Sequence, residues 1–93
     1  MTAQARHIVV YGRVQGVGFR YFVQRAGRRL ALTGDVRNRA DGTVEIVVEG
    51  ESAALSSFIE EVRQGPPASH VDRLQVREIP LSSNYATFML EGW

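Results

Sequence analysis

GRVQGVGFRYFV, residues 12–23, decides the fold, because one kind of regular structure changes into another within it. The residues leading into it, HIVVYGRVQ at 7–15, alternate between two faces, which is typical of a strand. From Tyr21 onward, apolar residues recur at helical spacing: Phe22, Val23, Ala26, Gly27 and Leu30. The stretch therefore predicts a strand, a tight loop over residues 15–20, and a helix for which Gly34 is the expected stop signal.

The remaining residues continue with short strands and one more helix. The predicted elements are strands at 34–38, 43–50 and 70–79, a helix between Gly50 and Gly65, and a short strand within 86–92. Asp41 and Gly42 belong to the expected hairpin turn, because aspartate is a common turn residue and glycine adopts a positive φ at little cost. We therefore expect Asp41 to stabilise the turn and to take no part in catalysis.

The element order β-α-β-β-α-β is that of the ferredoxin-like sandwich, an α+β fold. It predicts two helices on one face of an antiparallel sheet of four to five strands. Right-handed crossovers make the first strand parallel to the strand at 34–38, with the strand at 43–50 between them. The glycine loop and Asn38 then leave the same edge of the sheet, roughly 10 Å apart, and a phosphate-sized ion fits between them. A chain of 93 residues buries one modest core, so residues 1–93 are expected to form a single domain.

Composition narrows the classes of function. The chain has no cysteine, which excludes disulfides and thiolate metal sites. It also has no lysine, which excludes a phosphate-loop lysine and Schiff-base chemistry. The first residues lack the apolar run of a signal peptide, and no stretch is long enough to span a membrane. We therefore expect a cytoplasmic protein that makes no membrane contact.

Charge is distributed unevenly along the chain. Residues 1–40 carry eight arginines and a single acid, Asp35, whereas residues 41–93 carry three arginines and nine acids. An anion site in the first part would fit this imbalance, because a positive field concentrates anionic ligands. The alternative is that Arg25, Arg28 and Arg29 only form the solvated face of the helix.

The glycine loop lacks the residues of two common nucleotide-binding patterns. Phe19 and Arg20 stand where a phosphate loop needs lysine and serine or threonine, and Tyr21 stands where the dinucleotide fingerprint needs glycine. What remains is a turn whose N–H groups can face an anion at a helix N-terminus, with a guanidinium beside it. The candidate phosphate-binding residues are Gln15, Gly16, Val17, Gly18, Phe19 and Arg20. The alternative is that Gly16 and Gly18 only permit a sharp turn.

Two long motifs, GRVQGVGFRYFV at 12–23 and GDVRNRADGTVEIVVEG at 34–50, closely resemble the acylphosphatase family, and GPPASHV at 65–71 resembles the segment after its second helix. The resemblance covers about residues 7–89. It implies a stand-alone enzyme that hydrolyses acyl phosphates to carboxylate and inorganic phosphate without a cofactor. By this resemblance Arg20 and Asn38 are the catalytic residues: Arg20 binds the phosphate, and Asn38 positions the attacking water. It also implies that the substrate's own phosphate accepts the proton.

Other polar residues have weaker claims on the site. His7 and His70 are expected to be structural or exposed, and no cluster of histidines and carboxylates has metal-ligand spacing, so we expect no metal. Asp35 departs from the family pattern, and alternation predicts an exposed ion pair with Arg37. The carboxylate of Trp93 is expected to return to the catalytic edge, where it could orient Arg20.

The sequence also bears on partners and on rival functions. A small-molecule acyl phosphate is the expected partner, with inorganic phosphate as product and competitive inhibitor, and the protein is expected to be a monomer. Nucleic acid is not expected, because the strand at 43–50 lacks the aromatic residues on which RNA-recognition domains stack bases. A module that binds small anions without turnover remains an alternative. So does the acylphosphatase-like domain that begins a larger hydrogenase-maturation protein, although this chain lacks that protein's downstream segments.

Overall fold

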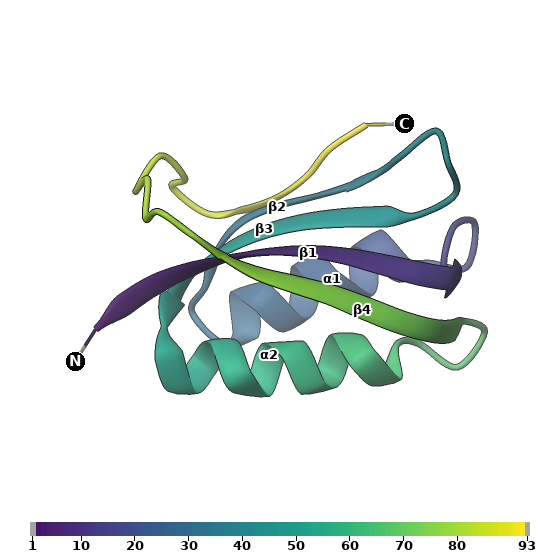
Figure 1. The fold of residues 1–93 in the computed structure, drawn as a ribbon, viewed down its shortest axis with the longest axis horizontal. Helices are drawn as coiled ribbons and strands as arrows, with labels where there is room; N and C mark the ends of the chain where they lie inside the picture. The colour runs from purple at the N-terminus through teal and green to yellow at the C-terminus, as the bar shows by residue number, and fades with distance from the viewer. Residues whose placement is uncertain (1, 93) are drawn as a thin grey trace.

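A computed structural model describes residues 2–92 as a sheet with two helices on one face (Figure 1). The elements are β1 (Ala3–Arg13), α1 (Phe19–Arg29), β2 (Thr33–Asn38), β3 (Val44–Glu51), α2 (Ser52–Gln64), β4 (His70–Ile79) and β5 (Phe88–Leu90). Neither helix of the described residues is long and apolar enough to cross a membrane. The predicted order of strands and helices is confirmed.

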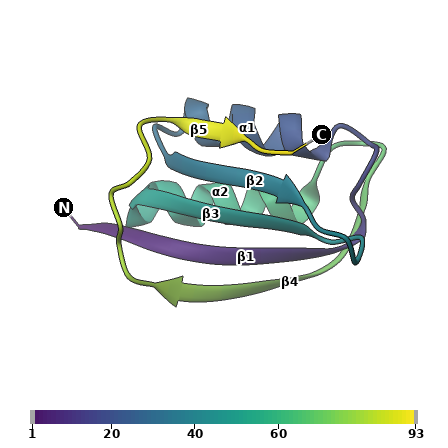
Figure 2. The ribbon, with the colours of Figure 1, turned by 90° about the horizontal axis from the view of Figure 1, so that it is seen from above.

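The strands lie in the order β4-β1-β3-β2-β5 (Figure 2). β3 pairs antiparallel with both β1 and β2, so β1 and β2 run parallel on either side of it, as predicted. β5 differs from the expected antiparallel sheet, because it pairs in parallel with β2 and makes the sheet mixed. The reason is that residues 80–87 carry the chain from one sheet edge to the other, where it adds a short strand beside β2 (Figure 2).

The core lies between the helices and the sheet. Val10, Val36 and Ile46 from three strands are fully buried there, and so are the rings of Phe58 and Phe88, whose centroids are 5.7 Å apart. α1 packs closely on β5, since a Cβ atom at Gly27 would overlap the Phe88 ring. This contact fixes β5, and therefore the segment that follows it, against α1.

The bounds of α1 differ from the prediction at both ends. The helix begins at Phe19, two residues before the predicted start, and ends at Arg29, well before Gly34. Ala31 adopts a left-handed φ of 60°, and the N–H of Leu32 donates to the carbonyl of Gly27, which together close the last turn. Gly34 instead lies within β2, where a Cβ atom would overlap the Val47 carbonyl oxygen.

The loop of residues 80–87 covers part of the sheet face opposite the helices. Glu49 is buried beneath it and accepts hydrogen bonds from the Ser82 N–H at 2.9 Å, the Ser82 hydroxyl at 2.7 Å and the Ser83 N–H at 3.0 Å. Burial raises the pKa of Glu49, but the bonds from Ser82 and Ser83 outweigh it and leave the pKa below its ordinary value. The ionised carboxylate therefore holds the loop on the sheet.

Asp35 lies beneath the same loop. It pairs with Arg37 at 3.1 Å as predicted, but it is buried rather than exposed. The Tyr85 hydroxyl approaches it at 3.4 Å, and both burial and the Asp35 carboxylate raise the pKa of Tyr85. The prediction of an exposed pair was wrong because strand alternation assigns a face without showing what covers it.

Glu49→Gln is expected to lower the free energy of unfolding at pH 7 by about 1–2 kcal/mol, because the charge-assisted bonds to the loop are lost. A carboxyl whose pKa is lowered by folding stabilises the protein above its unfolded pKa and loses that contribution as pH falls. Urea unfolding from pH 7 down to about pH 3 should therefore show a flatter acid dependence in the variant. Glu51→Gln, at an exposed carboxylate, is the control, and equal pH profiles in both variants would contradict the role of Glu49.

Candidate active site

The loop between β1 and α1 presents backbone N–H groups at a helix N-terminus. Gly16 and Gly18 adopt φ values of 74° and 77°, and Gly18 caps the helix without a side-chain hydrogen bond. No acidic residue lies in the first turn of α1. Within residues 2–92, the N–H groups of residues 15–19 donate to no protein acceptor. The loop therefore offers hydrogen-bond donors and the positive end of the helix dipole to an anion.

Two cavities meet beside this loop. The loop cavity, of about 110 Å³, is lined by Val14, Gly16, Gly18, Phe19, Arg20, Tyr21, Asn38 and Leu90. The Arg37 cavity, of about 230 Å³, is lined by Arg20, Arg37, Asn38, Glu91 and Gly92. Arg20 and Asn38 line both cavities, so the structure brings together the two residues that the sequence placed at one sheet edge.

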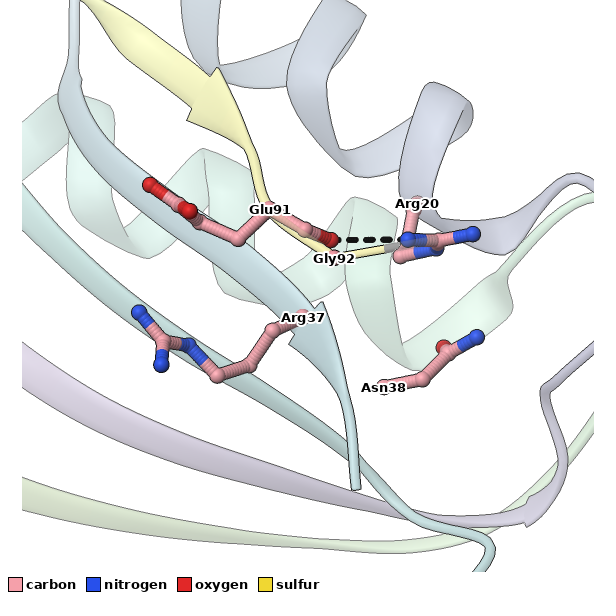
Figure 3. A pocket seen from close by; sticks show the side chains of 5 residues that line it. All are labelled: Arg20, Arg37, Asn38, Glu91 and Gly92. Atoms are coloured by element: carbon pink, nitrogen blue, oxygen red, sulfur yellow. Dashed lines mark hydrogen bonds between the residues drawn. The ribbon is translucent and has the colours of Figure 1, made fainter. Parts of the chain in front are cut away.

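Arg20 comes from the first turn of α1 and is held by the segment after β5. Its Nη1 donates to the backbone carbonyl of Glu91 at 2.7 Å (Figure 3). β5 reaches this position because it pairs with β2, and the N–H of Glu91 donates to the Val36 carbonyl at 2.9 Å. The expected contact between Arg20 and the Trp93 carboxylate lies outside the described residues.

Asn38, the last residue of β2, carries a buried oxygen that lacks a partner. Its Oδ1 has no hydrogen-bond partner among the described residues, although the Asn38 backbone is fixed by pairing with Val44. A buried polar atom without a hydrogen-bond partner lowers the free energy of unfolding by about 1–3 kcal/mol. Because Asn38 lines both cavities, its carboxamide is suited to accept a hydrogen bond from a water or a substrate group.

Four of the six residues predicted to bind phosphate line the loop cavity: Gly16, Gly18, Phe19 and Arg20. Val17 instead packs against the hydrophobic core, and Gln15 lines neither cavity. The Gln15 amide donates to the backbone carbonyls of Arg39 and Thr43. The side chain of Gln15 therefore contacts the turn between β2 and β3 and not the cavities.

Several cavity residues were missed by the sequence analysis. Leu90, Glu91 and Gly92 reach the site only because β5 pairs with β2, and no local pattern indicates that pairing. Arg37 is next to Asn38 on β2, but its side chain and that of Glu91 extend away from Arg20 and Asn38 (Figure 3). A hydrogen bond and the charge of Asp35 raise the pKa of Arg37, which keeps its guanidinium charged.

The histidines lie outside both cavities. His7 pairs with Glu45 at 2.8 Å on the open face of the sheet, and the exposed His70 pairs with Asp72 at 3.2 Å. Asp41 accepts bonds from the Thr43 N–H and hydroxyl, as a turn residue does, and these bonds lower its pKa. Within residues 2–92, no three histidine or carboxylate side chains gather closely enough to hold a metal ion.

Comparison with known proteins gives a consistent result. The family model for acylphosphatase matches residues 6–90. An acylphosphatase from Koribacter versatilis is 45% identical over 91 residues, which are 98% of this chain and 83% of that protein. The crystal structure of acylphosphatase from Bacillus subtilis has a TM-score of 0.92 and 44% identity, covering 98% of this chain and 100% of that one. Full-length HypF, solved in a phosphate- and nucleotide-bound form, has a TM-score of 0.85 and 38% identity, covering 98% of this chain but 12% of its own.

Gly18→Ala is expected to weaken the binding of inorganic phosphate about tenfold in calorimetric titration. A Cβ atom at Gly18 meets open space, so the cost is the left-handed backbone, about 1–2 kcal/mol for alanine. The loop relieves that strain by rotating its N–H groups away from the cavity. Gly42→Ala is a matched control, because Gly42 also has a positive φ and open space but lines neither cavity. Equal phosphate affinities in the two variants would contradict this role of the loop.

Proposed function

Since the chain belongs to the acylphosphatase family, enzymes that hydrolyse acyl phosphates, we propose that its loop and Arg20 bind the phosphoryl group and that Asn38 presents the attacking water. One observation carries this proposal. The unpartnered Oδ1 of Asn38 belongs to a residue on the wall of the cavity that it shares with Arg20 and the loop glycines. That arrangement supplies a nucleophile-positioning group opposite an anion-binding group.

The leaving group explains why the site needs no acid. An acyl phosphate releases a carboxylate, whose conjugate acid has a pKa near 4, so this oxygen departs without protonation at neutral pH. The protein therefore has to position the reactants and stabilise charge. Neither His7 nor His70 lines the cavities, which agrees with a reaction that requires no side-chain acid.

Hydrogen-bond donors of the loop and of Arg20 stabilise the negative charge on the phosphoryl oxygens. In phosphoryl transfer the transition state spreads negative charge over the three equatorial oxygens. The N–H groups of residues 15–19 point their dipoles at the anion, and the guanidinium of Arg20 presents two parallel N–H bonds. The carbonyl of Glu91 orients that guanidinium before substrate binds, so little reorganisation remains for the reaction itself.

The water is held by a neutral group. The Oδ1 of Asn38 accepts a hydrogen bond from the water, and the carboxamide does not titrate in the working pH range. The water oxygen attacks phosphorus in line with the departing carboxylate, and its proton passes to an oxygen of the substrate's own phosphoryl group. Hydrolysis then leaves inorganic phosphate on the same donors, so we propose phosphate as a competitive inhibitor.

We further propose a domain organisation, a metal-free chemistry, a location and an oligomeric state. Residues 1–93 form one domain, which the family match over residues 6–90 supports. The chemistry uses no metal ion or cofactor, since the donors above supply the positive charge, and activity should survive a chelator. The protein acts as a cytoplasmic monomer, and its cysteine-free composition suits a reducing compartment. Size-exclusion chromatography with light scattering tests the monomer.

Arg20→Gln is expected to lower kcat/KM for benzoyl phosphate at least 100-fold, because a charged donor to the transition state is lost. Phosphate inhibition should weaken in the same variant. Arg25→Gln, an exposed arginine on the same helix, should leave both unchanged and controls for the loss of one positive charge. Normal turnover by Arg20→Gln would remove Arg20 from the mechanism.

Asn38→Ala is expected to lower kcat by two or more orders of magnitude, about 3 kcal/mol, while the inhibition constant of phosphate stays within about twofold. The thermal midpoint should not fall, because the substitution removes a buried oxygen that has no partner. Asn84→Ala, in the exposed loop before β5, is the control. A variant that loses phosphate affinity but keeps kcat would show that Asn38 binds phosphate instead of positioning water.

A further inference from the structure

The side chain of Gln15 connects the two parts of the site, which are the loop between β1 and α1 and the end of β2 with the turn that follows it. Its Nε2 donates to the carbonyl of Arg39 at 2.7 Å and to the carbonyl of Thr43 at 2.9 Å. We propose that Gln15 is a positioning residue, which holds the phosphate-binding loop in register with the strand end that carries Asn38. This inference rests on the roles of the loop and Asn38 proposed above.

The contacted carbonyls close the turn between β2 and β3. The N–H of Arg39 donates to the Thr43 carbonyl at 2.9 Å, and the N–H of Gly42 donates to the Arg39 carbonyl at 3.1 Å. Gln15 adds one further donor to each of these two acceptors, so its amide bridges both sides of the turn. The side chain thereby ties the start of the loop to the turn.

Such a link adds to the packing of Val17 in the loop and to the strand pairing of Asn38, which fix one residue on each side of the site. Gly16 and Gly18 adopt left-handed conformations with open space around them, so packing does not fix the loop at these positions. Asn38 has no hydrogen bond at Oδ1 among the described residues, so no hydrogen bond of the side chain fixes that oxygen. Gln15 immediately precedes Gly16, and Arg39 immediately follows Asn38, which makes the link as short as the chain allows.

The contact between Gln15 and the turn requires a side chain that ends in an amide. Two carbonyl oxygens require two N–H donors on one nitrogen at the end of a side chain of this length, and the glutamine amide supplies both. Glutamate would place an anionic oxygen against two carbonyls, and methionine keeps the length but donates nothing. Misalignment of the water with the phosphoryl group should then slow the reaction far more than it weakens phosphate binding.

The test is a double-mutant cycle between Gln15→Met and Asn38→Ala, with kcat for benzoyl phosphate as the readout. Gln15→Met alone is expected to lower kcat about tenfold and to change the inhibition constant of phosphate less than about threefold. In the Asn38→Ala background the same substitution should change kcat less than about twofold, because the group it positions is absent. Gln64→Met, at the exposed end of α2, is the matched control and should change neither constant.

The outcomes separate this inference from the proposed function. Multiplicative losses of kcat, or a Gln15→Met variant that changes only the thermal midpoint, would overturn the positioning role of Gln15. Full activity of Asn38→Ala would overturn the proposed function whatever Gln15→Met does. If Gln15→Met does not fold, the cycle uses Gln15→Asn, whose amide is one methylene too short to reach both carbonyls. Multiplicative losses of kcat in that cycle would again overturn the positioning role of Gln15, and a loss that disappears in the Asn38→Ala background would support it.

Discussion

The parallel course of β1 and β2 on either side of β3 is the constraint on which the site depends. A right-handed crossover through α1 places the ends of both strands at one sheet edge. The loop after β1 must turn sharply there to begin the helix, and glycines with positive φ permit that turn. Donors at a helix N-terminus and a carboxamide at a strand end are therefore neighbours as a consequence of topology.

The contacts that hold the loop of residues 80–87 on the sheet also affect the site, because this loop is continuous with β5 and the residues after it. Glu49 holds the loop of residues 80–87, that loop leads into β5, and the residue after β5 accepts the hydrogen bond of Arg20. Phe88 fixes β5 against α1, because Gly27 leaves room for its ring. The guanidinium that is proposed to bind phosphate is therefore oriented by the segment that follows the last strand.

The sequence predicted those features whose signals are local. The change of period near Tyr21 revealed the strand and the helix, and topology then brought Arg20 and Asn38 to one edge. Features that depend on distant contacts were not predicted. The burial of Asp35 requires a loop some fifty residues further along, and the pairing of β5 with β2 joins segments far apart in the chain. The partners of Gln15 are backbone carbonyls, which every residue has, so the sequence does not single them out.

The cation at the centre of the site is a guanidinium, and this choice bears on the reactivity of the ligand. A mixed anhydride of a carboxylic and a phosphoric acid transfers its acyl group to free amines. A lysine beside the loop would bring such a nucleophile next to the anhydride whenever its ammonium lost a proton, and acylation would then erase the positive charge. A guanidinium is a poor nucleophile, because its nitrogen lone pairs are delocalised over the cation. The site can therefore hold an acylating agent close to the Arg20 cation without being modified by it.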